Sequence, residues 1–251
     1  MAIKFTTTGQ TATSSGLKIL IHGESGSGKT TLLGTTGEPT VIISAEGGML
    51  SLAKMNMPVI EVSSMADMRE AYAFLQTPQG KQFRWVGLDS VSEIAEKILA
   101  AEKRNAKDPR KAYGEMNDQL WDLVRGYRDM PDRDVVFIAK QERMKDDSTG
   151  ITSHLPSLPG KSASQGIDYF FDEVFALRVD RNPADPSQSV RYLQTGRDFQ
   201  YAAKDRSGAL AHFDWSSFLR RCGSPALRCP KSTDRSWYTV RWAALQRSSS
   251  T

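Results

Sequence analysis

The 251-residue sequence lacks the features that mark membrane, secreted and disulfide-stabilised proteins. No apolar run approaches the roughly 18 residues that a membrane-spanning helix requires. The N-terminal segment, rich in Thr, Ser and Gly, has no apolar stretch of the kind found in secretory signals. Cysteine occurs only at Cys222 and Cys229, and only His212 lies near them, which is too few ligands for a zinc site. We therefore expect a cytoplasmic protein without a membrane partner.

Most of the chain also lacks an excess of charge of either sign. The formal net charge is +4, but residues 204–251 hold nine basic and three acidic residues, which leaves 24 basic and 26 acidic residues before them. The basic excess thus lies in the C-terminal segment. An argument for nucleic-acid binding therefore has to rest on local segments and not on overall charge.

The strongest motif is a glycine-rich loop between a short apolar strand and the start of a helix. Residues 17–31 read LKILIHGESGSGKTT, and Gly23, Gly28, Lys29 and Thr30 match the phosphate-loop pattern G-x-x-x-x-G-K-[ST]. In that pattern backbone N–H groups surround a phosphate, the lysine adds a positive charge and the threonine hydroxyl contacts Mg²⁺. The sequence predicts a nucleoside triphosphate site made by Gly23, Glu24, Ser25, Gly26, Ser27, Gly28, Lys29, Thr30 and Thr31.

Apolar, β-branched segments alternate with segments of helical periodicity along the chain. We expect strands at residues 40–44, 59–62, 83–89 and 134–139, helices at 65–75, 90–103, 120–127 and 162–169, and a hairpin of residues 170–179 and 190–195. Such alternation is typical of a mostly parallel sheet covered by helices on both faces. The predicted fold class is an α/β P-loop NTPase fold whose edge is extended by the antiparallel hairpin. Residues 141–161 show no periodicity and are predicted to form a long loop.

The predicted organisation has three parts, with the α/β core at residues 17–207. Residues 1–16 form an N-terminal arm, which is either a frayed terminus or a segment that docks on a neighbouring subunit. Residues 208–251 form a basic tail rich in Ser, Arg and Trp, which we expect to be loosely ordered. Such a tail could also bind single strands by stacking and charge.

Three polar residues follow predicted strands, at positions where strand ends converge on a ligand. Asp89 could hold Mg²⁺ together with Thr30, or it could cap the helix that follows. Glu46, in the segment SAEGG, could orient or deprotonate a water molecule, or it could be a solvated loop residue. Gln141 could hydrogen-bond a γ-phosphate and report its presence to the segment behind it.

The segments GESGSGKT, SAEGG, GLDSV and VVFIAKQERMK, in that order, resemble the ATPase core of RecA/RadA-like recombinases. The resemblance covers residues 17–207 and is closest to phage-encoded RecA-core nucleotide-binding proteins of the Sak-type single-strand annealing group. It implies a RecA-like core that uses ATP and Mg²⁺. It also implies a catalytic set in which Glu46 is the hydrolytic base, Lys29 supplies charge and Gln141 senses the γ-phosphate.

The same resemblance implies two segments that contact single-stranded DNA. Residues 142–161 take the place of the second DNA-binding loop of the family and residues 103–113 that of the first, although both could also be solvated surface. The implied phosphate contacts are Arg143, Lys145 and Lys161 in the second segment and Lys103, Arg104, Lys107, Arg110 and Lys111 in the first. Lys204 and Arg206 resemble a terminal basic motif of the phage relatives, which implies an arginine-finger role toward a neighbouring subunit.

The expected function is ATP-dependent, DNA-stimulated binding of single-stranded DNA that promotes annealing or homologous recombination. The expected assembly is a homo-oligomeric ring or filament, with a single-strand-binding protein as a further candidate partner, in the cytoplasm of a bacterial host if the chain is phage-encoded. Strand exchange is not implied, because the chain departs from full recombinases at both ends. Two alternatives stay open: a P-loop nucleotide-binding module with little turnover that partners a replication or packaging protein, and a small-molecule P-loop kinase.

Overall fold

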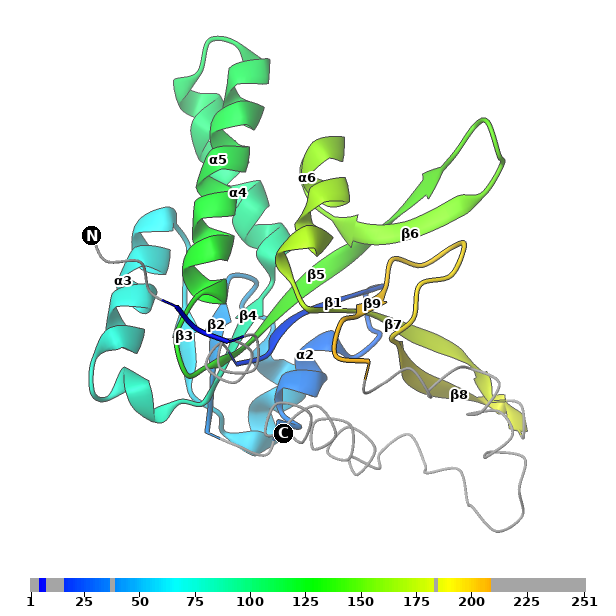
Figure 1. Ribbon diagram of the computed structural model, residues 1–251, viewed down its shortest axis with the longest axis horizontal. Helices are drawn as coiled ribbons and strands as arrows, with labels where there is room; N and C mark the ends of the chain where they lie inside the picture. The colour runs from blue at the N-terminus through cyan, green and yellow to red at the C-terminus, as the bar shows by residue number, and fades with distance from the viewer. Residues whose placement is uncertain (1–4, 8–15, 37–38, 183–184, 209–251) are drawn as a thin grey trace.

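The computed structural model describes residues 5–7, 16–36, 39–182 and 185–208 (Figure 1). Most of the predicted arm and almost all of the predicted tail lie outside these ranges. No helix in the described ranges is long and apolar enough to cross a membrane.

The sheet has the strand order β3-β2-β4-β5-β1-β7-β8, and its first six strands run parallel (Figure 1). β8 pairs with β7 in antiparallel fashion, and two further strands, β6 and β9, pair antiparallel with β5 and β7. The strands are β1 (Lys18–Gly23), β2 (Thr40–Ser44), β3 (Val59–Glu61), β4 (Trp85–Asp89), β5 (Asp134–Lys145), β6 (Thr152–Ser157), β7 (Glu173–Asn182), β8 (Asp185–Gln194) and β9 (Lys204–Asp205). The predicted α/β class, a mostly parallel sheet covered by helices and extended by an antiparallel edge hairpin, is confirmed.

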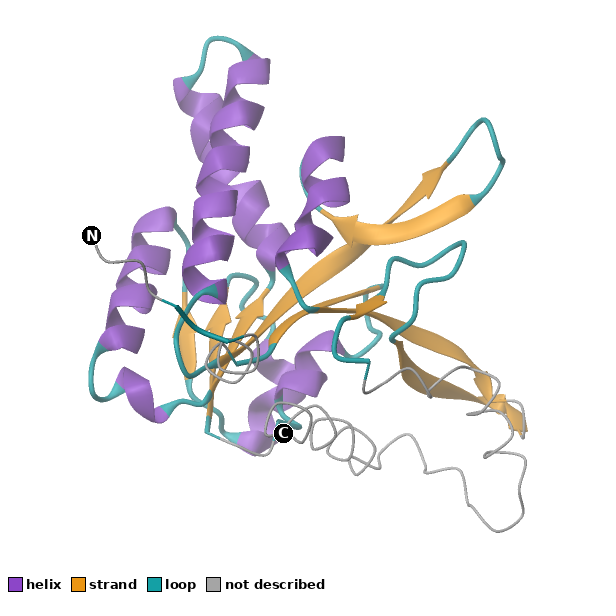
Figure 2. Cartoon of the chain, in the orientation of Figure 1, coloured by secondary structure: helices purple, strands orange, loops and turns teal. Residues whose placement is uncertain are grey.

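Helices cover both faces of the sheet (Figure 2). Alternate residues of each strand point to opposite faces, so the sheet has two apolar faces that must be buried. Ile19 and Ile21 of β1 belong to one apolar cluster, whereas Leu20 belongs to the other. The larger cluster is closed by α3, α4 and α5, and the smaller one by α2 and the 3-10 turn η1. The helices are α2 (Lys29–Leu33), α3 (Met65–Gln76), α4 (Val91–Asn105), α5 (Pro109–Arg128) and α6 (Lys161–Gly166), with 3-10 turns η1 (Met49–Met55), η2 (Gly80–Gln82) and η3 (Ile167–Phe170).

The prediction of a long loop over residues 141–161 is wrong. β5 continues to Lys145 and pairs with β6 from Lys140↔Ser157 to Lys145↔Thr152, so the segment is a β-hairpin that projects from the sheet (Figure 1). The β5 residues beyond Ala139 are half-buried or exposed on both faces of the strand. They therefore show none of the apolar alternation that marks a strand in sequence. The β5–β6 hairpin is nonetheless stabilised by backbone pairing.

The polar segment at residues 103–113, expected as the first DNA-binding loop, is also mostly helical. α4 extends to Asn105, and α5 begins at Pro109, a residue that is well suited to the first helical position. Asp108 caps α5, since its carboxylate accepts a hydrogen bond from the backbone N–H of Arg110 at 2.9 Å. The segment is therefore a tight corner between two helices.

Candidate nucleotide site

The glycine-rich loop joins β1 to α2 at the carboxyl edge of the sheet. Gly26 and Gly28 have φ of 74° and 102°, a region that residues with side chains rarely adopt. A Cβ atom on Gly23 would lie 2.8 Å from the carbonyl oxygen of Leu177 and 2.9 Å from Oγ of Ser27. These three glycines thus allow a backbone path that other residues would strain.

Lys29 lies folded across this loop. Its Nζ donates to the carbonyl oxygens of Gly23 at 2.9 Å and Glu24 at 2.8 Å. Burial lowers the pKa of its ammonium group, while the charges of Asp89 and Glu46 act in the opposite direction. A phosphate oxygen is a stronger acceptor than a neutral carbonyl, so the ammonium group is placed to transfer its hydrogen bonds to an anion.

Thr30 and Asp89 meet where β4 ends. The Thr30 hydroxyl donates to Oδ2 of Asp89 at 2.5 Å, and Asp89 is buried. Burial is the main cause that raises the pKa of this carboxyl group, and the Thr30 hydrogen bond opposes it. The alternative of Asp89 as a helix cap is not met, because Ser90 caps α4 by accepting from the N–H of Glu93 at 3.2 Å.

The residues at this edge fit Mg²⁺. A hydroxyl and a carboxylate oxygen are hard ligands of the kind that this ion prefers, and it is usually completed by water and substrate phosphates. Across the described ranges there is no cluster of three or more His, Cys, Asp or Glu side chains that could hold a metal alone. Thr30 and Asp89 would therefore share the ion with the nucleotide. Ser27 adds a buried Oγ atom that has no hydrogen-bond partner within the described part of the chain.

Glu46 lies just past the end of β2, beside β4. The hydroxyl of Ser90 donates to its carboxylate, and the peptide bond between Asp89 and Ser90 is cis. The backbone next to Glu46 is held by Lys97, whose Nζ donates to the carbonyl oxygen of Ala45. The structure thus brings Glu46, Asp89, Thr30 and Lys29 to one edge of the sheet, as the sequence predicted.

His22 connects the loop to the β5–β6 hairpin. Burial lowers the pKa of its imidazole to about 4, so the ring is neutral near pH 7. Its Nε2 donates to the carbonyl oxygen of Ala202 at 2.7 Å, which leaves Nδ1 as an acceptor. The side-chain amide of Gln141 lies 3.1 Å from that Nδ1 and, at its other end, 3.2 Å from Nδ1 of His154 on β6. In the structure the amide oxygen faces His22 and the NH₂ group faces His154. Because that oxygen and Nδ1 of His22 both accept, the amide is satisfied when it is turned by 180°, so that its NH₂ group donates to His22 and its oxygen accepts from His154.

Two arginines also contact the loop, and no pattern in the sequence predicts either contact. Arg143 of β5 forms an ion pair with Glu24, which links the β5–β6 hairpin directly to the loop. Nε of Arg191 on β8 donates to the carbonyl oxygen of Ser27 at 3.1 Å. These partners are 119 and 164 positions apart, so only the fold brings them together.

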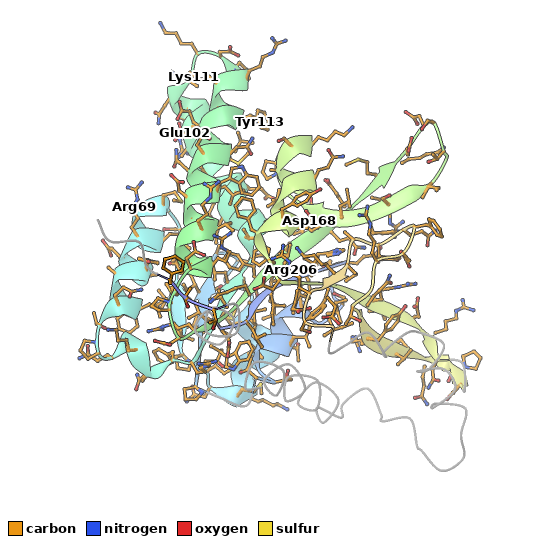
Figure 3. The ribbon with its side chains drawn as sticks, in the orientation of Figure 1. Arg69, Glu102, Lys111, Tyr113, Asp168 and Arg206 are labelled. Atoms are coloured by element: carbon orange, nitrogen blue, oxygen red, sulfur yellow. The ribbon has the colours of Figure 1, made fainter. Side chains whose placement is uncertain are left out.

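The candidate DNA contacts do not form one surface. Lys145 lies on the β5–β6 hairpin and Lys161 at the start of α6. The five basic residues of the other set lie at the corner between α4 and α5, and Figure 3 shows Lys111 at the free end of this helix pair. Lys103 is held there by a cation–π contact of 5.1 Å with Tyr113. In the view of Figure 1, α6 lies between this corner and the β5–β6 hairpin.

The two candidate finger residues are engaged within their own chain. Nζ of Lys204 donates to the carbonyl oxygen of Asp168 at 2.7 Å. Arg206 pairs with the carboxylate of Asp172 at 3.1 Å. To reach a neighbouring subunit, either residue would have to leave these partners.

Comparisons with known proteins were made for the whole chain. Residues 15–207 match the family model described as an AAA domain. None of the curated proteins compared with the chain matches it. Among solved structures, the crystal structure of the RadB recombinase is similar, with 17% sequence identity, 73% of this chain and 83% of that chain covered, and a TM-score of 0.40.

Proposed function

The chain belongs to the AAA domain family of P-loop NTPase domains, and from this premise we propose that it hydrolyses ATP and couples hydrolysis to the binding of single-stranded DNA. The proposal of ATP hydrolysis is supported by one observation. Four residues converge at one edge of the sheet: Lys29, Thr30, Asp89 and Glu46. The product of this activity would be annealed or recombined DNA, made by a homo-oligomer.

Each residue at this edge has a distinct role in hydrolysis. The loop from Gly23 to Thr31 holds the triphosphate, and Lys29 neutralises charge on its outer phosphates. Thr30 and Asp89 would hold Mg²⁺, which when bound would supply further neutralisation of the phosphate charge. Because Asp89 is buried beside Lys29, its negative charge is available to a cation and not to solvent.

Glu46 acts on water in this scheme. Its carboxylate accepts the proton of a water molecule as the water oxygen attacks the γ-phosphorus. The bond to the bridging oxygen breaks, and ADP and inorganic phosphate leave. The Ser90 hydroxyl orients the carboxylate by donating to one of its oxygens, so the other oxygen is left for water.

Coupling to DNA is supported by the contacts between the loop and the β5–β6 hairpin. Arg143 pairs with Glu24, and Gln141 connects His22 to His154. A γ-phosphate that attracts Lys29, Arg143 or Gln141 would alter these contacts and hence the position of the hairpin. The hairpin carries Lys145 beside Arg143, which is the chemistry needed to hold a phosphate backbone.

The test is hydrolysis of ATP by the full chain and by two matched variants. Glu46→Gln is expected to bind ATP normally and to lose roughly 100- to 10,000-fold in turnover, the range typical for loss of a general base. Glu61→Gln, an exposed glutamate at the end of the neighbouring strand β3, is the control and is expected to turn over normally. Equal loss in both variants, or none in either, would remove Glu46 from the mechanism. A phosphorylated small product in place of free phosphate would indicate a kinase.

A further inference from the structure

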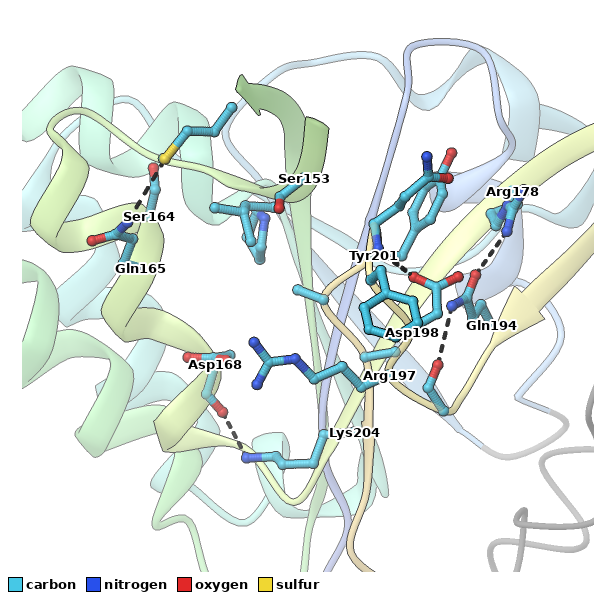
Figure 4. A pocket seen from close by; sticks show the side chains of 18 of the residues that line it. Ser153, Ser164, Gln165, Asp168, Arg178, Gln194, Arg197, Asp198, Tyr201 and Lys204 are labelled. Carbon is cyan, nitrogen blue, oxygen red and sulfur yellow. Dashed lines mark hydrogen bonds between the residues drawn. The ribbon is translucent and has the colours of Figure 1, made fainter. Parts of the chain in front are cut away.

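A large groove lies beside the β5–β6 hairpin, and nothing in the nucleotide chemistry uses it. Its volume is about 1660 Å³, and its walls are the hairpin, the α6–η3 segment and residues 194–205 (Figure 4). Figure 4 shows Gln165 and Asp168 on one side and Tyr201 and Asp198 on the other, with Arg197 extending between the two sides.

Two aromatic rings in this groove are free. Tyr169 is 78% exposed and Phe199 is 87% exposed, and neither ring packs on another ring or on a cation within the described residues. Tyr201 differs, since it stacks on His154 at 4.3 Å and carries the guanidinium of Arg178 at 4.3 Å. Single exposed apolar residues are common on protein surfaces, but two in one groove indicate a binding surface.

The groove is lined by equal numbers of cations and carboxylates, but they differ in how many are free to bind a ligand. Five cations and five carboxylates line it. Three of the carboxylates accept hydrogen bonds within their own turns: Asp146 from Ser148, Asp198 from Gln200 and Tyr201, and Asp205 from Ser207 and Gly208.

Three of the cations, by contrast, have no hydrogen bond or ion pair within the described ranges. These are Lys145, Lys161 and Arg197. Lys204 is bonded to a backbone carbonyl and Arg178 to Gln194 and Asp180. The other two carboxylates are Asp147, on the exposed hairpin turn, and Asp168, which lies beside Lys204 and Arg197 and has one buried oxygen without a hydrogen-bond partner among the described residues. The groups free to meet a ligand are therefore mainly positive charges and flat rings.

We propose that this groove binds a single strand of nucleic acid, with bases stacked on Tyr169 and Phe199 and phosphates held by Lys145, Lys161 and Arg197. The inference rests on the proposed function and adds the residues that would hold the strand. Unpaired bases can stack on free rings, whereas the bases of a duplex are already stacked on each other. An acidic peptide would use the cations but would leave the two rings without a partner.

The wall of the groove is joined to the nucleotide loop. Tyr201 stacks on His154, His154 bonds to Gln141, and Gln141 bonds to His22, which precedes the loop glycine Gly23. A strand in the groove would therefore contact the same segments that respond to the nucleotide. This connection is what distinguishes the groove from the corner between α4 and α5.

The experiment measures binding of the full chain to a fluorescein-labelled 20-nucleotide oligothymidine by fluorescence anisotropy, with and without ATP. Phe199→Ala and Tyr169→Ala are each expected to weaken binding roughly 5- to 150-fold, equivalent to about 1–3 kcal/mol for one base–ring stack. The conservative variants Phe199→Trp and Tyr169→Phe keep a ring and are expected to bind like the unmodified chain. Lys54 lies in η1, on the opposite face of the sheet, and Lys54→Ala is the control for the loss of one positive charge.

The outcomes separate this inference from the proposed function. Oligothymidine binding that is lost in the alanine variants and kept in the ring-preserving ones, with unchanged ATP binding and circular dichroism, supports the groove. If the unmodified chain binds oligothymidine and the alanine variants bind equally well, the groove is wrong and the proposed function stands. Equal affinity for a 20-base-pair duplex would likewise overturn base stacking. If the unmodified chain binds no single strand even with ATP, the proposal that single-stranded DNA is its partner is wrong.

Discussion

The nucleotide site and the groove are built in opposite ways. The loop from Gly23 to Thr31 is contiguous in sequence, follows β1, which lies between β5 and β7, and packs closely against Leu177 of β7 at Gly23. The groove is assembled from separate segments between Met144 and Asp205, and two of its aromatic side chains, Tyr169 and Phe199, are largely exposed. The comparison shows a rigid chemical site next to a surface that is held by a few polar and aromatic contacts.

The largest effect that separates the two regions is expected from Lys29→Ala. Removing the ammonium group should weaken ATP binding roughly 10- to 150-fold, because a hydrogen bond to a charged group contributes about 1.5–3 kcal/mol. Binding of oligothymidine without nucleotide should stay unchanged, since within the described residues the hydrogen bonds of the Lys29 side chain go to the loop and not to the groove. Titration calorimetry with ATP and anisotropy with the oligonucleotide measure the two quantities. Parallel loss of both would mean that the regions are one site.

The next largest effect is a pH dependence of the free energy of unfolding, which arises at Glu173, beside the groove residue Asp205. Burial, together with the neighbouring Asp205, raises the pKa of Glu173 to about 7, from 4.5. A carboxyl group whose pKa is raised in the folded state stabilises the fold below pH 4.5, and this contribution is lost as the pH rises through 7. The free energy of unfolding should therefore fall by roughly 2 kcal/mol between pH 5 and 8. Urea unfolding of Glu173→Gln should show a much flatter dependence, and an unchanged slope would exclude Glu173 as its source.

A smaller effect is expected at the connection between the regions. His154→Phe keeps a ring to stack on Tyr201 but removes the hydrogen bond to Gln141. One such bond contributes about 1 kcal/mol, so stimulation of ATP hydrolysis by single-stranded DNA should fall about 5-fold. Basal hydrolysis without DNA should not change. A variant that keeps full stimulation would show that the signal does not pass through Gln141.

The smallest effect is on salt dependence. Lys145→Ala and Lys161→Ala should each lower the slope of log affinity against log salt by about 0.7, as expected when one phosphate contact of a single strand is lost. Lys111→Ala, at the corner between α4 and α5, should leave the slope unchanged. If the slope changed only for Lys111→Ala, the DNA would bind at that corner and not in the groove.

The position of the candidate nucleotide-site residues at one edge of the sheet could be predicted from the sequence, because each of them follows a recognisable strand. Asp89 is found at the end of an apolar run, and Glu46 lies two residues past another strand, so periodicity locates both. The β5–β6 hairpin was missed because Thr152–Ser157 reads TSHLPS and buries no continuous face. Phe199 and Arg191 carry no pattern at all, since their importance comes from segments that the fold brings beside them.

The most direct test of the account is the rate of ATP hydrolysis by the full chain as single-stranded DNA is added, with a duplex of equal length in parallel. The account predicts that the single strand raises the rate, that the duplex does not, and that the double variant Tyr169→Ala, Phe199→Ala keeps the basal rate while losing the response. A rate that is the same with and without the single strand, at concentrations where the strand is bound, would contradict the coupling of the two regions.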